Sequence, residues 1–142
     1  MKQRILIIED DFTIQVQLKN LLSSNGYEVF AVTDFSKVIE QLKAFVPHLV
    51  LLDIKLPGNN GFEICSQIRT FSDMPIVFVT SSNTDMDELN SIMLGGDAFI
   101  TKPYNTAILL AKIAPYFDGR MLPGNQKYLH GMVQPCIWKA AS

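Results

Sequence analysis

The sequence has few cysteines and no long apolar run, which argues against a disulfide framework, a thiolate metal site or a membrane span. Among its 142 residues only Cys65 and Cys136 are cysteines, and they lie far apart without the spacing of metal ligands, so we expect reduced thiols. No apolar run is long enough to cross a bilayer. The run at residues 5–8 is also too short for the core of a signal peptide. We therefore expect a cytoplasmic protein that does not enter the membrane.

An excess of charge of one sign is also missing. Charged residues make up 18% of the chain and the formal net charge is −2, which argues against a chain that coats nucleic acid or anionic lipid. Hydrophobic residues make up 48%, which is ordinary for a globular domain with a real core. The composition therefore predicts a globular protein whose function depends on a local site.

Continuous apolar runs alternate with segments of helical spacing. Runs at residues 5–8, 49–52 and 76–79 predict strands buried on both faces, and weaker runs at 29–32 and 98–100 predict two more. The apolar faces of the predicted helices are Ile14, Leu18, Leu21 and Leu22; Val38, Leu42 and Phe45; Ile64, Ile68 and Phe71; Met86, Leu89 and Met93; and Ile108, Leu109 and Ile113, in a helix starting near Asn105. Strand and helix repeated five times predict an α/β fold with a doubly wound parallel sheet.

The chain divides near residue 117. We expect one domain over residues 1–117, a normal size for a domain. Residues 118–142 contain several interrupting glycines and prolines and no clear apolar period, so we expect a tail or truncated linker without a recognisable effector domain. This stretch is too short for a winged helix, and we therefore expect no DNA binding by this chain alone.

Polar residues follow the predicted strands at the point where each strand ends. They are Glu9, Asp10 and Asp11 after the first strand, Asp53 after the third, Thr80 after the fourth and Lys102 after the fifth. In an open α/β sheet the ligand crevice lies at the carboxyl ends of the strands, so we expect these groups to converge. Clustered carboxylates repel unless a cation lies among them, and their oxygens suit Mg²⁺. A carboxylate beside Mg²⁺ can attack a phosphoryl group, which a lysine and a hydroxyl then contact.

Taken in order, these features resemble the receiver domains of two-component response regulators. Asp53 is followed at fixed spacing by Pro57 and Gly61, and Lys102 by Pro103; the resemblance covers roughly residues 3–117. It implies a flavodoxin-like five-stranded sheet of order 2-1-3-4-5 with five helices. Residues 102–105 and the following helix resemble receivers of winged-helix transcription regulators, which implies transcription regulation as the output.

The resemblance also implies a role for each site residue. Asp53 would be the phosphoacceptor. Mg²⁺ would be bound by Asp10, Asp53 and the backbone carbonyl of Lys55, and by Glu9 through water. Thr80 and Lys102 would bind the phosphoryl group, and Thr80 and Phe99 would be the switch residues. The donor would be a sensor histidine kinase, with self-phosphorylation from small acyl phosphates and self-dephosphorylation as further reactions. The switched face would be the fourth helix, fifth strand and fifth helix, through which a homodimer would form.

Other interpretations stay open at this stage. An aspartyl-phosphate phosphatase would carry a second Asp two residues after its nucleophile, where this chain has Lys55. A nucleotide or flavin domain would need a Gly-rich or Ser/Thr-rich loop after the first strand, where this chain has acids. Taken singly, Asp10 or Asp11 could cap a helix, Thr80 could be a turn residue and Phe99 a core residue. Their shared edge of the sheet favours the functional interpretation.

Overall fold

The structure is a computed structural model, and it describes residues 2–56, 58–80 and 97–117. Five parallel strands form its central sheet in the order β2-β1-β3-β6-β7. They are β1 (Arg4–Ile8), β2 (Glu28–Ala31), β3 (Leu49–Leu52), β6 (Ile76–Thr80) and β7 (Ala98–Thr101). Counted along the chain they are the five predicted strands, in the predicted order 2-1-3-4-5. The flavodoxin-like, doubly wound α/β fold is therefore confirmed.

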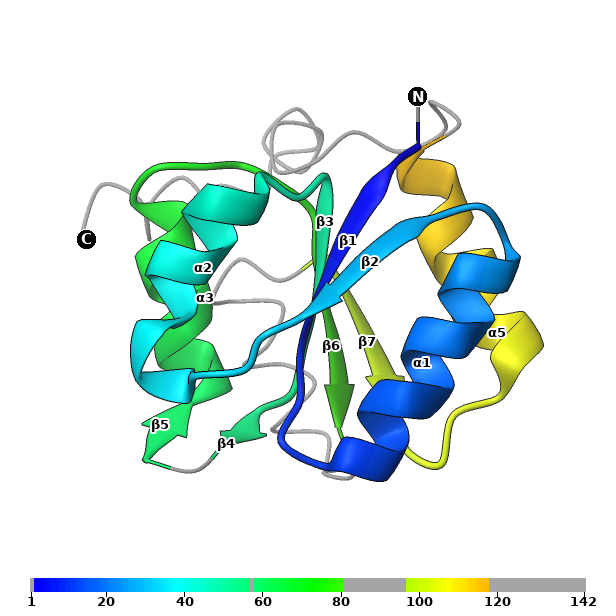
Figure 1. Cartoon of the computed structure of the whole chain (residues 1–142), viewed down its shortest axis with the longest axis horizontal. Coiled ribbons are helices and arrows are strands. Elements are labelled where there is room, and N and C mark those ends of the chain that lie inside the picture. The colour runs from blue at the N-terminus through cyan, green and yellow to red at the C-terminus, as the bar shows by residue number, and fades with distance from the viewer. Residues whose placement is uncertain (1, 57, 81–96, 118–142) are drawn as a thin grey trace, which may run out of the picture.

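Helices cover both faces of the sheet. The described helices are α1 (Phe12–Ser24), α2 (Val38–Phe45), α3 (Gly61–Arg69) and α5 (Thr106–Ile113), with short 3₁₀ turns at Phe35–Lys37 and Ala114–Tyr116. In Figure 1, α1 and α5 lie on one side of the sheet and α2 and α3 on the other. The predicted helix with Met86, Leu89 and Met93 falls in residues 81–96, and the predicted tail in residues 118–142; both lie outside the described residues.

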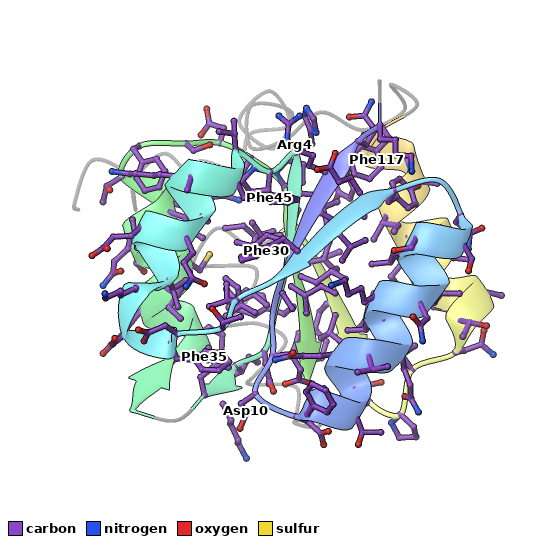
Figure 2. All side chains as sticks on the ribbon, viewed as in Figure 1. Arg4, Asp10, Phe30, Phe35, Phe45 and Phe117 are labelled. Carbon is purple, nitrogen blue, oxygen red and sulfur yellow. The ribbon has the colours of Figure 1, made fainter. Side chains whose placement is uncertain are left out.

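The continuous apolar runs are explained by these two layers. Every residue of β3 is buried, and in β1 only Arg4 is not, because alternate side chains enter two separate cores. One core lies against α2 and α3, and the partly buried rings of Phe30 and Phe45, with centroids 5.5 Å apart, pack against it (Figure 2). The other lies against α1 and α5. Figure 2 also shows Asp10 and Arg4 at opposite ends of the sheet, so the candidate site lies far from the amino end of β1.

Polar caps set the helix starts. Asp11 accepts a hydrogen bond from the backbone N–H of Ile14 at the start of α1, and Asn105 accepts two at the start of α5. These contacts satisfy N–H groups that have no partner within the helix. The cap expected at Asp11 and the helix start expected near Asn105 are both confirmed. None of the described helices is long and apolar enough to reach across a membrane.

Two residues predicted on buried helix faces are exposed. Phe71 lies beyond the end of α3 at Arg69, is 42% exposed, and has the ammonium of Lys43 over its ring. Ile108 is 52% exposed, because the buried stripe of α5 runs through Leu109 and Ile113. Ile108 is one residue off that stripe, about 100° around the helix. The pattern of apolar residues therefore extended the third helix too far, to Phe71, and predicted too wide a buried face for α5.

Candidate functional site

Three carboxylates from two strand ends meet at the carboxyl edge of the sheet. Glu9 and Asp10 follow β1, and Asp53 follows β3 directly. One carboxylate oxygen of each lies within 4.8 Å of the others. Parallel pairing of β1 with β3 aligns the two strand ends, with Ile8 opposite Leu52. The structure thus brings together three of the four acids expected at this edge, Glu9, Asp10 and Asp53, whereas the side chain of Asp11 caps α1.

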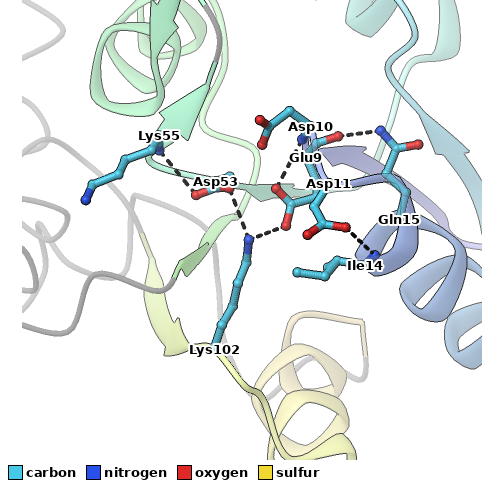
Figure 3. Close-up of polar contacts among 8 residues, drawn as sticks. All are labelled: Glu9, Asp10, Asp11, Ile14, Gln15, Asp53, Lys55 and Lys102. Atoms are coloured by element: carbon cyan, nitrogen blue, oxygen red, sulfur yellow. Dashed lines mark hydrogen bonds and ion pairs between the residues drawn. The ribbon is translucent and has the colours of Figure 1, made fainter.

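Lys102 reaches into this cluster from the end of β7. Its Nζ donates to Asp53 Oδ2 at 3.1 Å and also to Glu9 Oε1 (Figure 3). Burial alone would lower the pKa of Lys102, but its hydrogen bonds to Glu9 and Asp53 and their charges outweigh burial and raise it. The ammonium therefore stays charged and offsets part of the negative charge of the acids.

Asp53 is held as an ionised carboxylate. It is only 6% exposed, and its Oδ1 accepts the backbone N–H of Lys55 at 3.2 Å. Burial raises the pKa of Asp53, but hydrogen bonds with Glu9, Lys102 and Lys55 and the charge of Lys102 together bring it below its usual range. An ionised carboxylate is the form that can act as a nucleophile.

Glu9 differs from Asp53 in its protonation. Its side chain is almost fully buried, and burial followed by the proximity of Asp53 raises its pKa to about 8. Asp10, in contrast, is exposed. With this raised pKa, Glu9 keeps a proton near neutral pH. The ammonium of Lys102 is thus not enough to hold all three carboxyl groups of the cluster in their ionised form. This donor set fits a hard divalent cation, which would replace that proton.

The turn that carries the two acids is tightly hydrogen-bonded. The backbone N–H of Asp10 donates to Glu9 Oε2 at 3.1 Å. The side-chain amide of Gln15 donates to the backbone carbonyl of Glu9. Gln15 was not predicted, because a glutamine in the first turns of an amphipathic helix gives no signal that separates it from a solvated surface residue.

A small hairpin follows Asp53 on the other side of the site. Its strands, β4 (Lys55–Leu56) and β5 (Asn59–Asn60), pair antiparallel. The N–H of Gly61 donates to the carbonyl of Ile54 at 2.7 Å, and Asn60 caps α3. The side chain of Lys55 is exposed. Its backbone, however, lies beside Asp53, and its carbonyl is the group predicted to bind the metal. The hairpin was not predicted, although Gly58 at φ +66° suits the tight turn between its strands.

Of the two predicted switch residues, Phe99 is described in full and Thr80 only in its backbone. Thr80 ends β6, where its backbone is paired with Thr101; its side chain lies outside the described part of the chain. Phe99 is half-buried on β7, where its backbone is paired with Phe78 of β6. Its ring packs against the core on the side of α2 and α3. The carbonyl of Phe99 accepts a hydrogen bond from Lys112 of α5 at 2.8 Å. The Phe99 ring thus has a core environment in this structure.

Comparison with known proteins identifies the family. The family model described as "Response regulator receiver domain" matches residues 5–114. The sensory transduction protein BceR of Halalkalibacterium halodurans is 44% identical over 110 residues, which are 78% of this chain and 48% of BceR. The chain spans about half the length of the curated relatives it matches.

Solved structures agree with this match. The N-terminal domain of the nisin resistance regulator NsrR is 42% identical with a TM-score of 0.76, covering 82% of this chain and 98% of that one. The BeF₃-activated receiver domain of Klebsiella pneumoniae RstA is 31% identical with a TM-score of 0.77, covering 80% and 97%. These matches give no support to the phosphatase alternative. The chain belongs to the receiver domain family of two-component response regulators.

Proposed function

We propose that this receiver domain accepts a phosphoryl group on Asp53 from a sensor histidine kinase and that Mg²⁺ is required. The observation that carries the proposal is the contact of Lys102 Nζ with Asp53 Oδ2 at 3.1 Å, inside a cluster of three carboxylates. The carboxylate of Asp53 is thereby ionised and buried next to a cation that can bind incoming phosphoryl oxygens. If Asp53 and Lys102 formed only a structural ion pair, or if Asp10 only capped a helix, the fold would not need to gather three carboxylates at this point.

The residues that would hold the metal are Asp10, Asp53 and the backbone carbonyl of Lys55, with Glu9 acting through water. Bound Mg²⁺ would supply positive charge that lowers repulsion between the acids and the incoming phosphoryl group. The exposed carboxylate of Asp10 leaves room for the water ligands that Mg²⁺ keeps. The proton on Glu9 would leave as the cation enters, because the raised pKa of Glu9 reflects burial and the nearby charge of Asp53.

The chemical step follows from the roles of these side chains. A carboxylate oxygen of Asp53 attacks phosphorus, the P–N bond to the kinase histidine breaks, and the electron pair of that bond stays on the imidazole. Lys102 turns from Asp53 to an oxygen of the transferred group. Thr80 would donate its hydroxyl to another oxygen. The same geometry serves small acyl phosphates as donors, and water attacking the aspartyl phosphate would reverse the modification.

We propose that phosphorylation is read out through β7 and α5. Phe99 and Thr80 would change position when the new phosphoryl group attracts the Thr80 hydroxyl. This change would shift the face made by β7, α5 and the fourth helix that the sequence predicts, and so favour a homodimer. Residues 1–117 would form the phosphoacceptor domain in the cytoplasm and residues 118–142 a linker or tail. Transcription would be regulated by protein outside this chain, and this chain alone would not bind DNA.

The test is phosphorylation in vitro with acetyl phosphate and Mg²⁺, followed by intact mass measurement. The expected result is a single phosphoryl adduct that requires Mg²⁺ and is absent in Asp53→Asn. Asp11→Asn is a matched control, since Asn caps a helix as well as Asp does, and it should be modified normally. An adduct that persists in Asp53→Asn, or forms equally well in EDTA, would refute the assignment.

Two further variants separate metal binding from phosphoryl binding. Asp10→Asn should weaken Mg²⁺ binding, and Lys102→Ala should leave Mg²⁺ binding largely intact while impairing the spectroscopic change on adding beryllofluoride. Rapid turnover of a free phosphomonoester would instead favour the phosphatase alternative.

A further inference from the structure

We infer that Gln15 is a positioning residue for the metal site, acting on Glu9 and Asp10 without contacting the metal. The inference rests on the proposed function, because it concerns the Mg²⁺ that the site would hold. Gln15 lies in the second turn of α1 and is half-buried. Figure 3 shows its side-chain amide turned back along the helix toward the peptide between Glu9 and Asp10.

Both polar groups of that peptide are held by side chains. Its carbonyl, which belongs to Glu9, accepts the hydrogen bond from Gln15. Its N–H, which belongs to Asp10, donates to Glu9 Oε2 at 3.1 Å. Glu9 Oε1 in turn accepts a hydrogen bond from Lys102. A peptide held at both ends cannot rotate freely, so the directions in which the Glu9 and Asp10 side chains leave the backbone are fixed.

The rest of the turn does not make Gln15 redundant. Asp11 caps α1 through Ile14 N, and the carbonyl of Asp11 accepts Gln15 N at 2.9 Å. These contacts fix Asp11 and the helix start, but they do not reach the carbonyl of Glu9. Without the Gln15 amide, the peptide would still be held by the bond from Asp10 N to the Glu9 carboxylate. That carboxylate, however, is the group that must rearrange when a cation enters.

The expected consequence is weaker metal binding with a smaller effect on the chemistry. Partners that orient metal ligands typically change metal affinity by about 10–100-fold when removed. Gln15 acts through the backbone, so we expect the low end, roughly tenfold weaker Mg²⁺ binding. The loss of Mg²⁺ affinity should exceed any change in the rate of phosphorylation by acetyl phosphate at saturating Mg²⁺, because the hydrogen bond from Gln15 goes to the backbone of Glu9 and reaches Lys102 only through the Glu9 carboxylate.

The test compares Gln15→Met with Gln17→Met in the full chain. Met has the length and helix propensity of Gln but no amide donor, and Gln17 is an exposed residue of the same helix. Mg²⁺ affinity is measured by calorimetric titration, with Mn²⁺ as a second probe. Hydrogen exchange of the Asp10 amide without metal is measured alongside. We expect roughly tenfold weaker binding and faster Asp10 exchange in Gln15→Met, and wild-type values in Gln17→Met.

The outcomes distinguish this inference from the proposed function. If wild-type protein binds Mg²⁺ and takes up phosphoryl groups but Gln15→Met has unchanged Mg²⁺ affinity, the inference is overturned and the function stands. If wild-type protein binds no Mg²⁺, the function itself fails. Should Gln15→Met not fold, Gln15→Asn, one methylene too short to reach Glu9, replaces it with the same expected loss; unchanged affinity there overturns the inference equally.

Discussion

Gly61 lies directly against the backbone of Asp53, the candidate phosphoacceptor. A Cβ atom built on Gly61 would be 2.2 Å from the carbonyl oxygen of Asp53 and 2.7 Å from the Cα of Ile54. Atoms that close must move, and both neighbours are backbone atoms that cannot rotate away. Glycine at this position therefore lets α3 start against the backbone of Asp53 and Ile54, which follow β3.

We predict that Gly61→Ala lowers both stability and phosphoacceptor activity. Relieving the clash requires a backbone shift, which we expect to reduce the free energy of unfolding by about 2–4 kcal/mol, as for severe overpacking. Because the shift acts on Asp53, phosphorylation by acetyl phosphate should also slow. Urea unfolding and the rate of adduct formation measure the two effects.

Gly26→Ala is the matched control for this prediction. Gly26 has φ +91°, but a Cβ added there would meet no atom of the described residues within 4 Å, and it lies far from the site in the turn after α1. Gly26→Ala should lower the free energy of unfolding by about 1–2 kcal/mol, the cost of a left-handed backbone for a residue with a Cβ atom. It should leave the phosphorylation rate unchanged. Equal effects of both substitutions on that rate would contradict the role of Gly61.

The sequence predicted the sheet well because of burial on two faces. A strand such as β3, buried at every residue, has no polar alternation, and its short length between chain breakers favours an interior strand over a buried helix. The convergence of Glu9, Asp53 and Lys102 was also predictable, because parallel strands end at one edge and the chain's polar residues follow those ends.

Contacts between distant segments were not predictable from the pattern. Arg69 and Asp97 are 28 residues apart and form a buried ion pair of 2.9 Å, yet an arginine at a helix end and an aspartate after two glycines each suggest a solvated residue. The same holds for Gln15. Such roles depend on which side chains the fold places together. Away from the strand ends, residue type and periodicity do not show which side chains will meet.

We predict that Val46→Gly stabilises the protein. Val46 has φ +54°, in the left-handed region, where a β-branched residue is strained. Its side chain is 59% exposed, so little burial is lost. After the extra entropy that glycine loses on folding, we expect a gain of about 0.5–1 kcal/mol in urea unfolding. Val16→Gly, inside α1 and 39% exposed, should instead destabilise by about 1 kcal/mol; stabilisation by both would point to another cause.

We predict that Asp97→Asn is strongly destabilising. Both side chains of the Arg69–Asp97 pair are about 1% exposed, and Asp97 Oδ2 also accepts the N–H of Ile76 at 2.8 Å. Removing one charge leaves the guanidinium buried beside a neutral amide, at a cost of about 3 kcal/mol or more. Asp34→Asn, an exposed cap that Asn also makes well, should cost close to nothing by the same measurement.

A double-mutant cycle checks the origin of that cost. Arg69→Met removes the other charge, and the variant with both substitutions should be less destabilised than the sum of the two single variants. Strict additivity would mean that the ion pair itself contributes nothing.

We predict that the metal-free protein loses stability as pH rises from about 4.5 to 8. The pKa of Glu9 is about 8 in the folded protein against an ordinary 4.5, so in this window the folded state binds a proton that the unfolded state lacks. Unfolding then releases a proton, and the free energy of unfolding falls with pH, by at most about 1.4 kcal/mol per unit. The lowered pKa of Asp53 and the raised pKa of Lys102 act below and above the window.

Glu9→Gln isolates the contribution of this carboxyl. Urea unfolding in EDTA at several pH values should show a smaller fall in stability for Glu9→Gln than for the wild type, since the amide does not titrate. His48, whose pKa burial and Arg4 lower, contributes equally to both proteins and cancels in the difference. Saturating Mg²⁺ should also remove the fall in the wild type, because the cation takes the place of the proton. Parallel pH profiles of the two proteins in EDTA would show that Glu9 is ionised in the folded state.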